Sequence, residues 1–324
     1  MATVESVSTK NFSVPFPGSA PLIPTDLPSD RLAKLRELPE RLLRGIRGQD
    51  DVVPRIVSVL QRGELGLSHQ ERPRGSFMFL GPTGVGKTEI TLQFSDFLFG
   101  EGYLARFDMS EFQGEDSVRL LIGANNSDPG RLGAVLQKMD RGTLLFDEME
   151  KAEKKILDVF LQMTDAARIT LATGQTYQLS NFYLVFTSNI GSADIMRLEK
   201  APYASLERHV LAKASQQLRP EFFARITEKL VFRKLSYEVQ IQVAEIMLQK
   251  ELKQLGAKGY FLEADSRVMN FLVMKGYHPY LGARPMRTAI EKYVQDAVAE
   301  SILQGRSGSG RITVDSSRDR LHIE

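Results

Sequence analysis

Short apolar runs alternate with helix-like patterns through the first two thirds of the chain. Ile90, Phe94, Phe97 and Leu98 keep the spacing of one helix face. Four runs have the pattern of buried strands: Ser76 to Leu80, Leu104 to Met109, Thr143 to Phe146 and Tyr183 to Thr187. We therefore predict an α/β domain over residues 30–233, in which a parallel sheet is flanked by helices.

The apolar pattern changes after Arg233, where a helical period dominates. Val268, Phe271 and Leu272 fit one helix, and a second predicted helix has an apolar residue at nearly every fourth position: Met286, Ile290, Val294, Val298 and Ile302. Two alternating runs close the sequence, Ile312/Val314 and Leu321/Ile323, with polar residues between them. They predict a β-hairpin that caps a small, mainly helical lid domain over residues 234–324.

The first 29 residues have a different composition. Five of the 14 prolines lie there among Ser, Thr and Gly: Pro15, Pro17, Pro21, Pro24 and Pro28. Because proline has no backbone N–H, this segment cannot hold the hydrogen bonds of a helix or a sheet. We predict a flexible arm over residues 1–29, too short for a separate substrate-recognition domain or a further ATPase module.

Composition excludes several classes of function. The 324 residues are 42% hydrophobic and 25% charged, which is ordinary for a globular protein of about two domains. Lys+Arg 42 against Asp+Glu 40 gives a net charge of +2, which argues against a nucleic-acid or membrane partner. Cys 0 excludes disulfides and thiol catalysis. We find neither a membrane-spanning run nor a signal peptide, and expect a cytoplasmic protein.

A glycine-rich loop follows the first predicted strand and opens a helix: Gly81, Pro82, Thr83, Gly84, Val85, Gly86, Lys87 and Thr88. In that context, such a loop places backbone N–H groups around the phosphates of a nucleotide. Lys87 would reach the β- and γ-phosphates, and Thr88 would be a ligand of Mg²⁺. The alternative is a plain glycine-rich turn.

Two carboxylates end the third predicted strand. Asp147 would hold Mg²⁺ through water, and Glu148 is placed to polarise an attacking water, which favours ATP hydrolysis over mere binding. On its own, such a pair could also be a strand that ends in solvated acids. Asn189 follows the next strand, which would bring its amide near the γ-phosphate, although an isolated Asn is more often a turn or cap residue.

The chain resembles the second ATPase module of the Clp family of AAA+ unfoldases and disaggregases, the ClpA and ClpB type. The resemblance covers Ile23 to Glu324. Its motifs are Arg47 to Asp50, Gly75 to Glu89, Phe107 to Phe112, Leu121 to Ala124, Phe146 to Ala152, Thr187 to Gly191, Arg219 to Phe222 and Gly282 to Pro285. It implies an Mg²⁺-dependent ATPase that works as a ring, most often a hexamer.

The resemblance also assigns residues that the local pattern does not. Ile46, Arg47, Gly48 and Gln49 would line the adenine pocket. Arg225 matches the arginine finger that reaches the nucleotide of the neighbouring subunit, and Arg284 matches the arginine that senses nucleotide from the small domain. Without the family, either arginine would be taken for half of a surface salt bridge. Ala224 and Thr227 depart from the Asn and Asp that usually surround the finger.

The family's Gly-Tyr-Val-Gly loop, whose tyrosine grips the polypeptide in the central pore, is missing. Ala124 is followed by polar residues, and no aromatic residue occurs between Phe112 and Phe146. Short polar groups lack the apolar contact area of an aromatic grip, so threading is in doubt. Between Asn189 and Arg219 there is no Ile-Gly-Leu or Ile-Gly-Phe tripeptide of the kind that docks such rings on the Clp peptidase, which argues against peptidase coupling.

Three hypotheses follow. The first is a ring-forming ATPase that remodels or disassembles a particular protein complex. The second is an ATP-dependent switch or assembly factor that does not pull on polypeptide, which the missing aromatic residue favours. The third, a nucleic-acid-directed AAA+ loader, is the weakest because no basic run interleaved with aromatic residues occurs.

Overall fold

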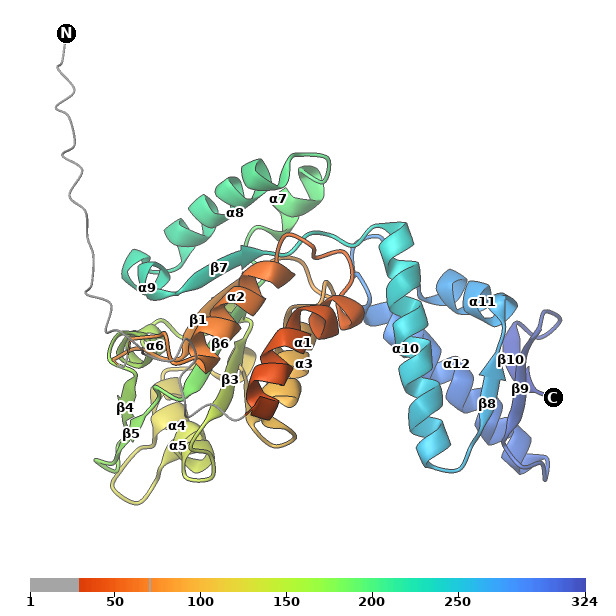
Figure 1. The fold of residues 1–324 in the computed structure, drawn as a ribbon, viewed down its shortest axis with the longest axis horizontal. Helices are drawn as coiled ribbons and strands as arrows, with labels where there is room; N and C mark the ends of the chain where they lie inside the picture. The colour runs from red at the N-terminus through yellow and green to blue at the C-terminus, as the bar shows by residue number, and fades with distance from the viewer. Residues whose placement is uncertain (1–28, 70) are drawn as a thin grey trace, which may run out of the picture.

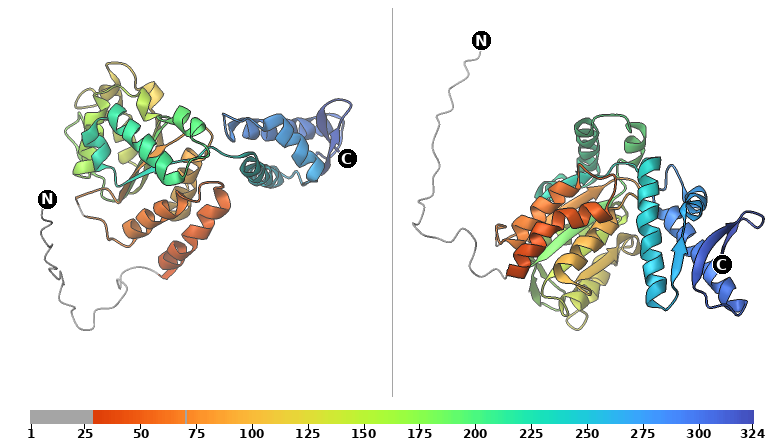
Figure 2. Two further views of the ribbon diagram at one scale, coloured as in Figure 1. Left: turned by 90° about the horizontal axis from the view of Figure 1, so that it is seen from above. Right: turned by 45° about the vertical axis from the view of Figure 1, so that its right-hand side comes forward.

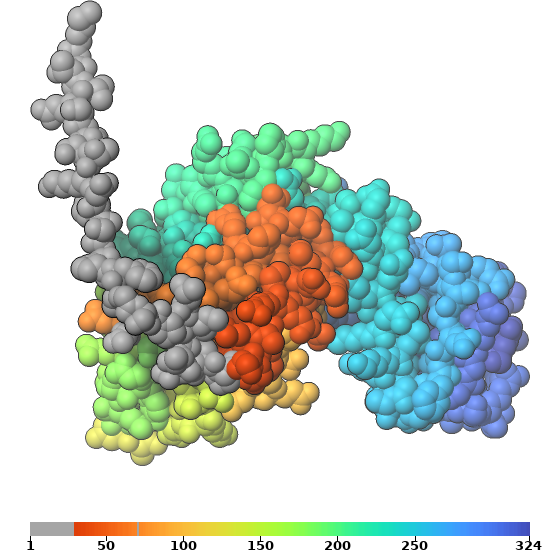
Figure 3. Space-filling model, viewed as in Figure 1, coloured from red at the N-terminus to blue at the C-terminus, as the bar shows by residue number. Residues whose placement is uncertain are grey.

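The computed structural model describes residues 29–69 and 71–324. The predicted arm falls outside this part of the chain except for Ser29, the first residue of helix α1 (Ser29–Gly45). The described residues form two bodies of unequal size, which meet where α10 (Tyr237–Ala257, cyan) faces the larger one (Figures 1 and 3).

A five-stranded parallel sheet forms the centre of the larger body. Its strand order is β2-β3-β6-β1-β7. The strands are β1 (Gly75–Leu80), β2 (Leu104–Asp108), β3 (Gly142–Asp147), β6 (Phe182–Ser188) and β7 (Glu228–Val231). The predicted α/β fold is confirmed, and the four predicted strands lie within one residue of their expected bounds. The pattern missed β7, an edge strand with only two apolar residues.

Alternate residues of each strand point to opposite faces of the sheet. On β1, Phe77 and Phe79 pack against α1, α2 (Val53–Glu64) and α3 (Lys87–Phe99), the helix predicted from Ile90 and Phe94. Met78 and Leu80 pack into the core on the other face. Figure 2 shows helices on both sides of the sheet. Because both faces are covered, these strands are apolar at almost every position.

Among the described residues, the second face is covered by six helices, of which α8 is the longest. They are α4 (Ser117–Ile122), α5 (Gly130–Leu136), α6 (Ile156–Asp165), α7 (Ser192–Arg197), α8 (Tyr203–Gln217) and α9 (Pro220–Arg225). A hairpin of β4 (Arg168–Thr170) and β5 (Thr176–Gln178) follows α6. Sequence reasoning missed this hairpin because each strand has only three residues. On this face, Phe146 stacks on Phe186 with ring centroids 5.3 Å apart.

The smaller body has its own apolar core. Three helices form it, α10, α11 (Ser266–Gly276) and α12 (Arg284–Leu303), and the first two begin at side-chain caps, Ser236 and Asp265. The predicted terminal hairpin is confirmed as β9 (Gly310–Asp315) and β10 (Arg320–Ile323), joined by a parallel third strand, β8 (Leu262–Ala264). The apolar stripe of α12 is buried only as far as Val298: Ile302 is 42% exposed, near the end of the helix.

No helix in the described part of the chain combines the length and the apolar character needed to cross a membrane.

A buried carboxylate ties the helices of one face to the sheet. Glu64, at the end of α2, accepts hydrogen bonds from Arg31 Nη2 at 2.6 Å, Arg74 Nη1 at 2.9 Å and Tyr183 Oη at 3.0 Å. Burial, together with the charge of Glu64, raises the pKa of Tyr183 well above its ordinary value. These partners belong to α1, to the segment before β1 and to β6, so one side chain joins three parts of the core.

We expect Glu64→Ala to lower the free energy of unfolding by about 3–5 kcal/mol, because the partly buried Arg74 and the buried Tyr183 lose their partner. The exposed pair Glu40–Arg44 on α1 is the matched control. Glu40→Ala should cost less than about 0.5 kcal/mol. Urea unfolding followed by circular dichroism measures both, and equal losses would contradict a structural role for Glu64.

Candidate functional site

The glycine-rich loop forms one wall of a cavity of about 240 Å³ at the carboxyl end of the sheet. Thr83, Gly84, Val85, Gly86, Lys87 and Thr88 all line this cavity. Gly86 adopts φ 106°, and α3 begins at the next residue. The free N–H groups at the start of α3 therefore face the cavity, an arrangement that binds phosphate.

Lys87 lies in the loop with its amino group folded back on the backbone. Nζ donates to the carbonyl of Gly81, to that of Pro82 at 2.8 Å and to Asn189 Oδ1 at 3.0 Å. Burial lowers the pKa of Lys87 to about 8, against the opposing effect of Asp147 and its acidic neighbours. A phosphate group would offer this ammonium a stronger acceptor than the carbonyls. Pro82 thus contributes a carbonyl to the site, although its ring does not line the cavity.

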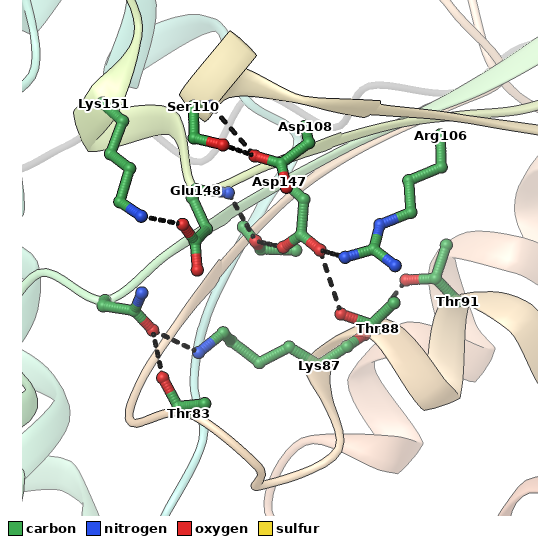
Figure 4. Close-up of polar contacts among 12 residues, drawn as sticks. Thr83, Lys87, Thr88, Thr91, Arg106, Asp108, Ser110, Asp147, Glu148 and Lys151 are labelled. Atoms are coloured by element: carbon green, nitrogen blue, oxygen red, sulfur yellow. Dashed lines mark hydrogen bonds and ion pairs between the residues drawn. The ribbon is translucent and has the colours of Figure 1, made fainter. Parts of the chain in front are cut away.

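Asp147 and Thr88 meet beside the loop. Thr88 Oγ1 donates to Asp147 Oδ2 at 3.4 Å, and the hydroxyl of Thr187 donates to Oδ1 (Figure 4). A hydroxyl and a carboxylate are hard oxygen donors that suit Mg²⁺, which usually takes one or two protein ligands and keeps waters and phosphate oxygens as the rest. Within residues 29–69 and 71–324 no cluster of three acidic or histidine side chains offers a rival metal site. The donor set therefore fits Mg²⁺.

Glu148 has an unusual backbone conformation for a residue with a side chain. It adopts φ 60° and ψ 50°, the left-handed region, and its N–H donates to Thr187 Oγ1 at 3.1 Å. This conformation turns the chain away from β3, and the carboxylate lines the cavity. The carboxylate pairs with Lys151, whose pKa it raises. Such local strain is typical of residues at functional sites.

Asn189 also lines the cavity. Its Oδ1 accepts from Lys87 and lies 3.5 Å from Thr83 Oγ1, while its N–H donates to Glu150 at 3.1 Å. β6, the strand before Asn189, runs parallel beside β3, the strand that ends at Asp147. Asn189 after β6, Glu148 after β3 and Lys87 at the start of α3 thus line one cavity.

An apolar section of the cavity lies beyond the loop. Ile46 and Arg47 line it, together with Leu235, Val243 and Met247. Gly48 and Gln49 do not line it. The buried Gln49 instead donates to the carbonyls of Val85 at 3.2 Å and Arg233 at 3.0 Å. Of the predicted adenine-pocket residues, Ile46 and Arg47 therefore line the cavity, whereas Gln49 hydrogen-bonds to the backbone around it.

The smaller body closes the cavity through Ala283 and Arg284. Arg284 lines the cavity, and the N–H of Ala283 donates to the carbonyl of Gly84 at 2.9 Å. Gly282 adopts φ 58°, and a Cβ there would lie 2.5 Å from the carbonyl oxygen of Gly84. The loop and the smaller body are therefore in direct backbone contact. Sequence reasoning missed Val243, Met247, Arg287 and Arg106, cavity residues that only the tertiary fold brings there.

Arg225 lies outside the cavity, at the opposite end of the sheet. It ends α9, just before β7, where Glu228 pairs with Phe77 and Thr227 Oγ1 contacts Ser76. From Ser76 to Gly81, where the loop begins, β1 spans about 16 Å at ~3.3 Å per residue. Arg225 therefore does not reach this chain's own cavity. Its guanidinium pairs with Asp165 at 3.1 Å and donates to the carbonyl of Glu221 at 3.0 Å.

The polar segment between α4 and α5 forms a tight turn. Asp128 accepts from the N–H of Ala124 at 3.1 Å and of Gly130 at 2.9 Å, and Asn125 accepts from the N–H of Ser127 at 2.9 Å. Gly123 adopts φ 97°, and a Cβ there would lie 1.9 Å from the carbonyl oxygen of Asp128. The segment is closed by its own hydrogen bonds, and residues 124–127 are exposed.

Comparison with known proteins identifies both bodies. A family model described as "AAA domain (Cdc48 subfamily)" matches residues 72–229, and one described as "C-terminal, D2-small domain, of ClpB protein" matches residues 235–314. Chaperone protein ClpB of Agrobacterium fabrum is 36% identical over 310 residues, which are 92% of this chain and 36% of that protein. A ClpA homolog, the ATP-binding subunit of an ATP-dependent Clp protease of Cyanidium caldarium, is 33% identical over 320 residues, 91% of this chain and 38% of that one.

A solved structure shares the fold. A closed-state cryo-electron-microscopy reconstruction of Hsp104 with ATPγS and FITC-casein matches with a TM-score of 0.81 and 29% identity, over 92% of this chain and 53% of that one. The chain spans little more than a third of the length of the ClpB and ClpA relatives named above.

We expect Gly282→Ala to weaken the contact between the smaller body and the loop, because the added Cβ meets the backbone of Gly84 in addition to a strained φ. Gly305 is the matched control, since it also has positive φ (76°) but nothing within 4 Å of an added Cβ. Gly305→Ala should cost about 1–2 kcal/mol from backbone strain alone, and Gly282→Ala a further 1–3 kcal/mol. Thermal unfolding measures both, and equal losses would contradict the contact.

Proposed function

Because the chain belongs to the Clp-type AAA+ ATPases, a family of ATP-hydrolysing enzymes, we propose that it binds Mg²⁺-ATP in the cavity beside Lys87. We further propose that it works as a ring, most often a hexamer in this family, to remodel or disassemble a specific protein complex. We propose that it does so in the cytoplasm and without coupling to the Clp peptidase.

The observation that carries the proposal is the convergence of Lys87, Asp147, Glu148 and Asn189 on one cavity at the carboxyl end of a parallel sheet. In such sheets, ligands bind at this end. An ammonium, a magnesium carboxylate, and further groups that position the attacking water recur in enzymes of phosphoryl transfer.

Each side chain then has one role. Lys87 and the N–H groups at the start of α3 hold the phosphates, and Thr88 and Asp147 hold the metal. The Mg²⁺ would neutralise phosphate charge as it develops in the transition state. Glu148 takes the proton of the attacking water, which Asn189 orients. The adenine of the nucleotide is surrounded by Ile46, Arg47, Val243 and Met247. Arg284 contacts the nucleotide from the smaller body and so links that body to the phosphate loop.

Assembly into a ring is supported by the position of Arg225. It lies at least about 16 Å from the loop of its own chain, so it does not complete that chain's own site. Asp165 and the Glu221 carbonyl hold the guanidinium at this surface. We propose that Arg225 completes the site of the next subunit.

The closed polar turn between α4 and α5 favours a second candidate, an ATP-dependent switch or assembly factor that does not thread polypeptide. Residues 124–127 offer short polar groups and no aromatic surface. A remodeller should show an ATPase rate that depends on its protein partner, whereas a switch should show an oligomer size that depends on the bound nucleotide. Nucleic acid is the weakest candidate partner, and an ATPase rate that rises with DNA would favour it.

We expect Glu148→Gln to keep ATP binding and to lose ~10²–10⁴ of the hydrolysis rate, because it removes the general base but keeps the phosphate and metal contacts. Lys87→Ala should lose binding itself. Binding of a fluorescent ATP analogue and release of phosphate measure the two effects. If both variants bind ATP equally weakly, this division of roles is wrong. The Glu148→Gln protein, stalled with ATP, is also the bait for capturing the partner complex.

We expect Arg225→Ala to keep the nucleotide affinity and to lose ~10³–10⁵ of the turnover, the usual contribution of an arginine finger. Mixing Arg225→Ala with Glu148→Gln subunits tests the geometry. Some interfaces would pair an intact Glu148 with an intact Arg225, so the mixture should recover part of the ATPase activity that each variant lacks. No recovery in an oligomer shown to be mixed would argue against a site between subunits.

A further inference from the structure

Arg106 is a cavity residue that the proposed mechanism does not use. It lies on β2, the edge strand of the sheet, two residues before the strand ends. Arg106 pairs in register with Leu145, and Asp108 with Asp147, so the side chains of Arg106 and Asp147 lie on the same face. The guanidinium reaches along this face to the carboxylate, and Nη2 lies 2.6 Å from Asp147 Oδ2 (Figure 4).

Arg106 contacts the oxygen that the metal would need. Oδ2 is the atom of Asp147 that faces Thr88 Oγ1, whereas Oδ1 is taken by the hydroxyl of Thr187. A guanidinium on Oδ2 and a Mg²⁺ held at that oxygen, directly or through water, would lie close enough for strong repulsion between their charges. Metal binding therefore requires Arg106 to move.

The two partners differ in their freedom to move. The Asp147 side chain is 9% exposed and fixed by Thr187, so its charge needs a permanent counter-ion. The Arg106 side chain is 50% exposed, and its guanidinium has no other hydrogen bond within the part of the chain that the structure describes. Arg106 can therefore swing into solvent at small cost while Asp147 stays in place.

We propose that Arg106 is the internal counter-ion of Asp147, which occupies the carboxylate until a metal–nucleotide complex displaces it. The inference rests on the proposed binding of Mg²⁺-ATP and adds a residue that controls how much metal this binding needs. Arg106 competes with divalent metal for Asp147, and so raises the metal concentration at which the nucleotide complex is half-formed. The buried carboxylate is then neutralised by one cation or the other throughout the cycle.

The sign of the effect separates this role from the obvious alternative, in which Arg106 is a ligand of the phosphates. Removal of a competing cation makes metal bind more tightly and leaves metal-free nucleotide binding unchanged. Removal of a phosphate ligand makes metal-free nucleotide bind more weakly. Arg106→Gln keeps much of the side-chain length and removes the charge, so it distinguishes the two roles.

The test uses Mn²⁺ as a magnetic probe in the presence of saturating ADP, with free Mn²⁺ measured by electron paramagnetic resonance. We expect the half-saturating Mn²⁺ concentration to fall roughly three- to tenfold in Arg106→Gln. Arg106→Lys, which keeps the charge but has a shorter reach, should shift it in the same direction by less. Arg119→Gln on α4, an exposed arginine paired with Asp116, is the control for net charge and should leave it unchanged.

Three results would overturn the proposal: an unchanged half-saturating concentration, a higher one, or a loss of ADP affinity in EDTA that parallels the change with metal. If Arg106→Gln does not fold, as judged by circular dichroism, Arg106→Lys gives the same comparison. Failure of the underlying function looks different, because the wild-type protein would then bind no Mn²⁺–ADP or would bind it as well after Lys87→Ala. If the wild-type protein binds Mn²⁺–ADP through Lys87 and the Arg106 variants have the same half-saturating Mn²⁺ concentration, only the role of Arg106 is overturned.

Discussion

Parallel pairing of β6 with both β1 and β3 determines where the phosphate loop, Asp147, Glu148 and Asn189 lie relative to one another. Leu80 pairs with Ser188 on one side of β6, and Phe146 with Phe186 on the other. This register brings the start of the glycine-rich loop, the carboxylate of Asp147 and the amide of Asn189 to one level. The register itself depends on packing, because Phe146, Phe186 and Phe160 interlock on one face of the sheet. A slip of one residue would turn these rings away from their core and scatter the site.

The parts of the fold that sequence patterns predicted are those with strong, local signals. Strands buried on both faces leave unbroken apolar runs, and the glycine-rich loop is contiguous along the chain. The edge strand β7 was missed because Glu228 and Lys229 are partly exposed. Arg106 and Met247 were missed as cavity residues because their place depends on strand register and on contact between the two bodies. The position of Arg225 away from its own loop likewise became visible only from the register of β7 with β1.

Electrostatics in the cavity reflect a site built for a highly charged ligand. Lys87, Arg106, Arg284 and Arg287 all line it, against Asp147, Glu148 and Glu89. Three of these cations contact protein groups: Lys87 donates to backbone carbonyls, Arg106 to Asp147 and Arg287 to Glu89. Each of these contacts is one that a nucleotide and its metal would replace. Binding of a nucleotide would therefore replace one set of ion pairs and hydrogen bonds by another, so that few charges in the cavity lack a partner before or after binding.

The separation of Arg225 from the phosphate loop has a consequence for how many working sites an assembly holds. If Arg225 serves the adjacent subunit, each chain carries the two halves of two different sites at opposite ends of one sheet. A closed circle then has as many complete sites as subunits, whereas an arc with one open seam has one fewer. The subunit at the seam holds nucleotide without a finger and is silent until the seam closes or moves. The ATPase activity per chain would thus depend on whether the ring is closed. An enzyme of this design can be switched off at one site by opening a single interface between subunits, with no change in any cavity.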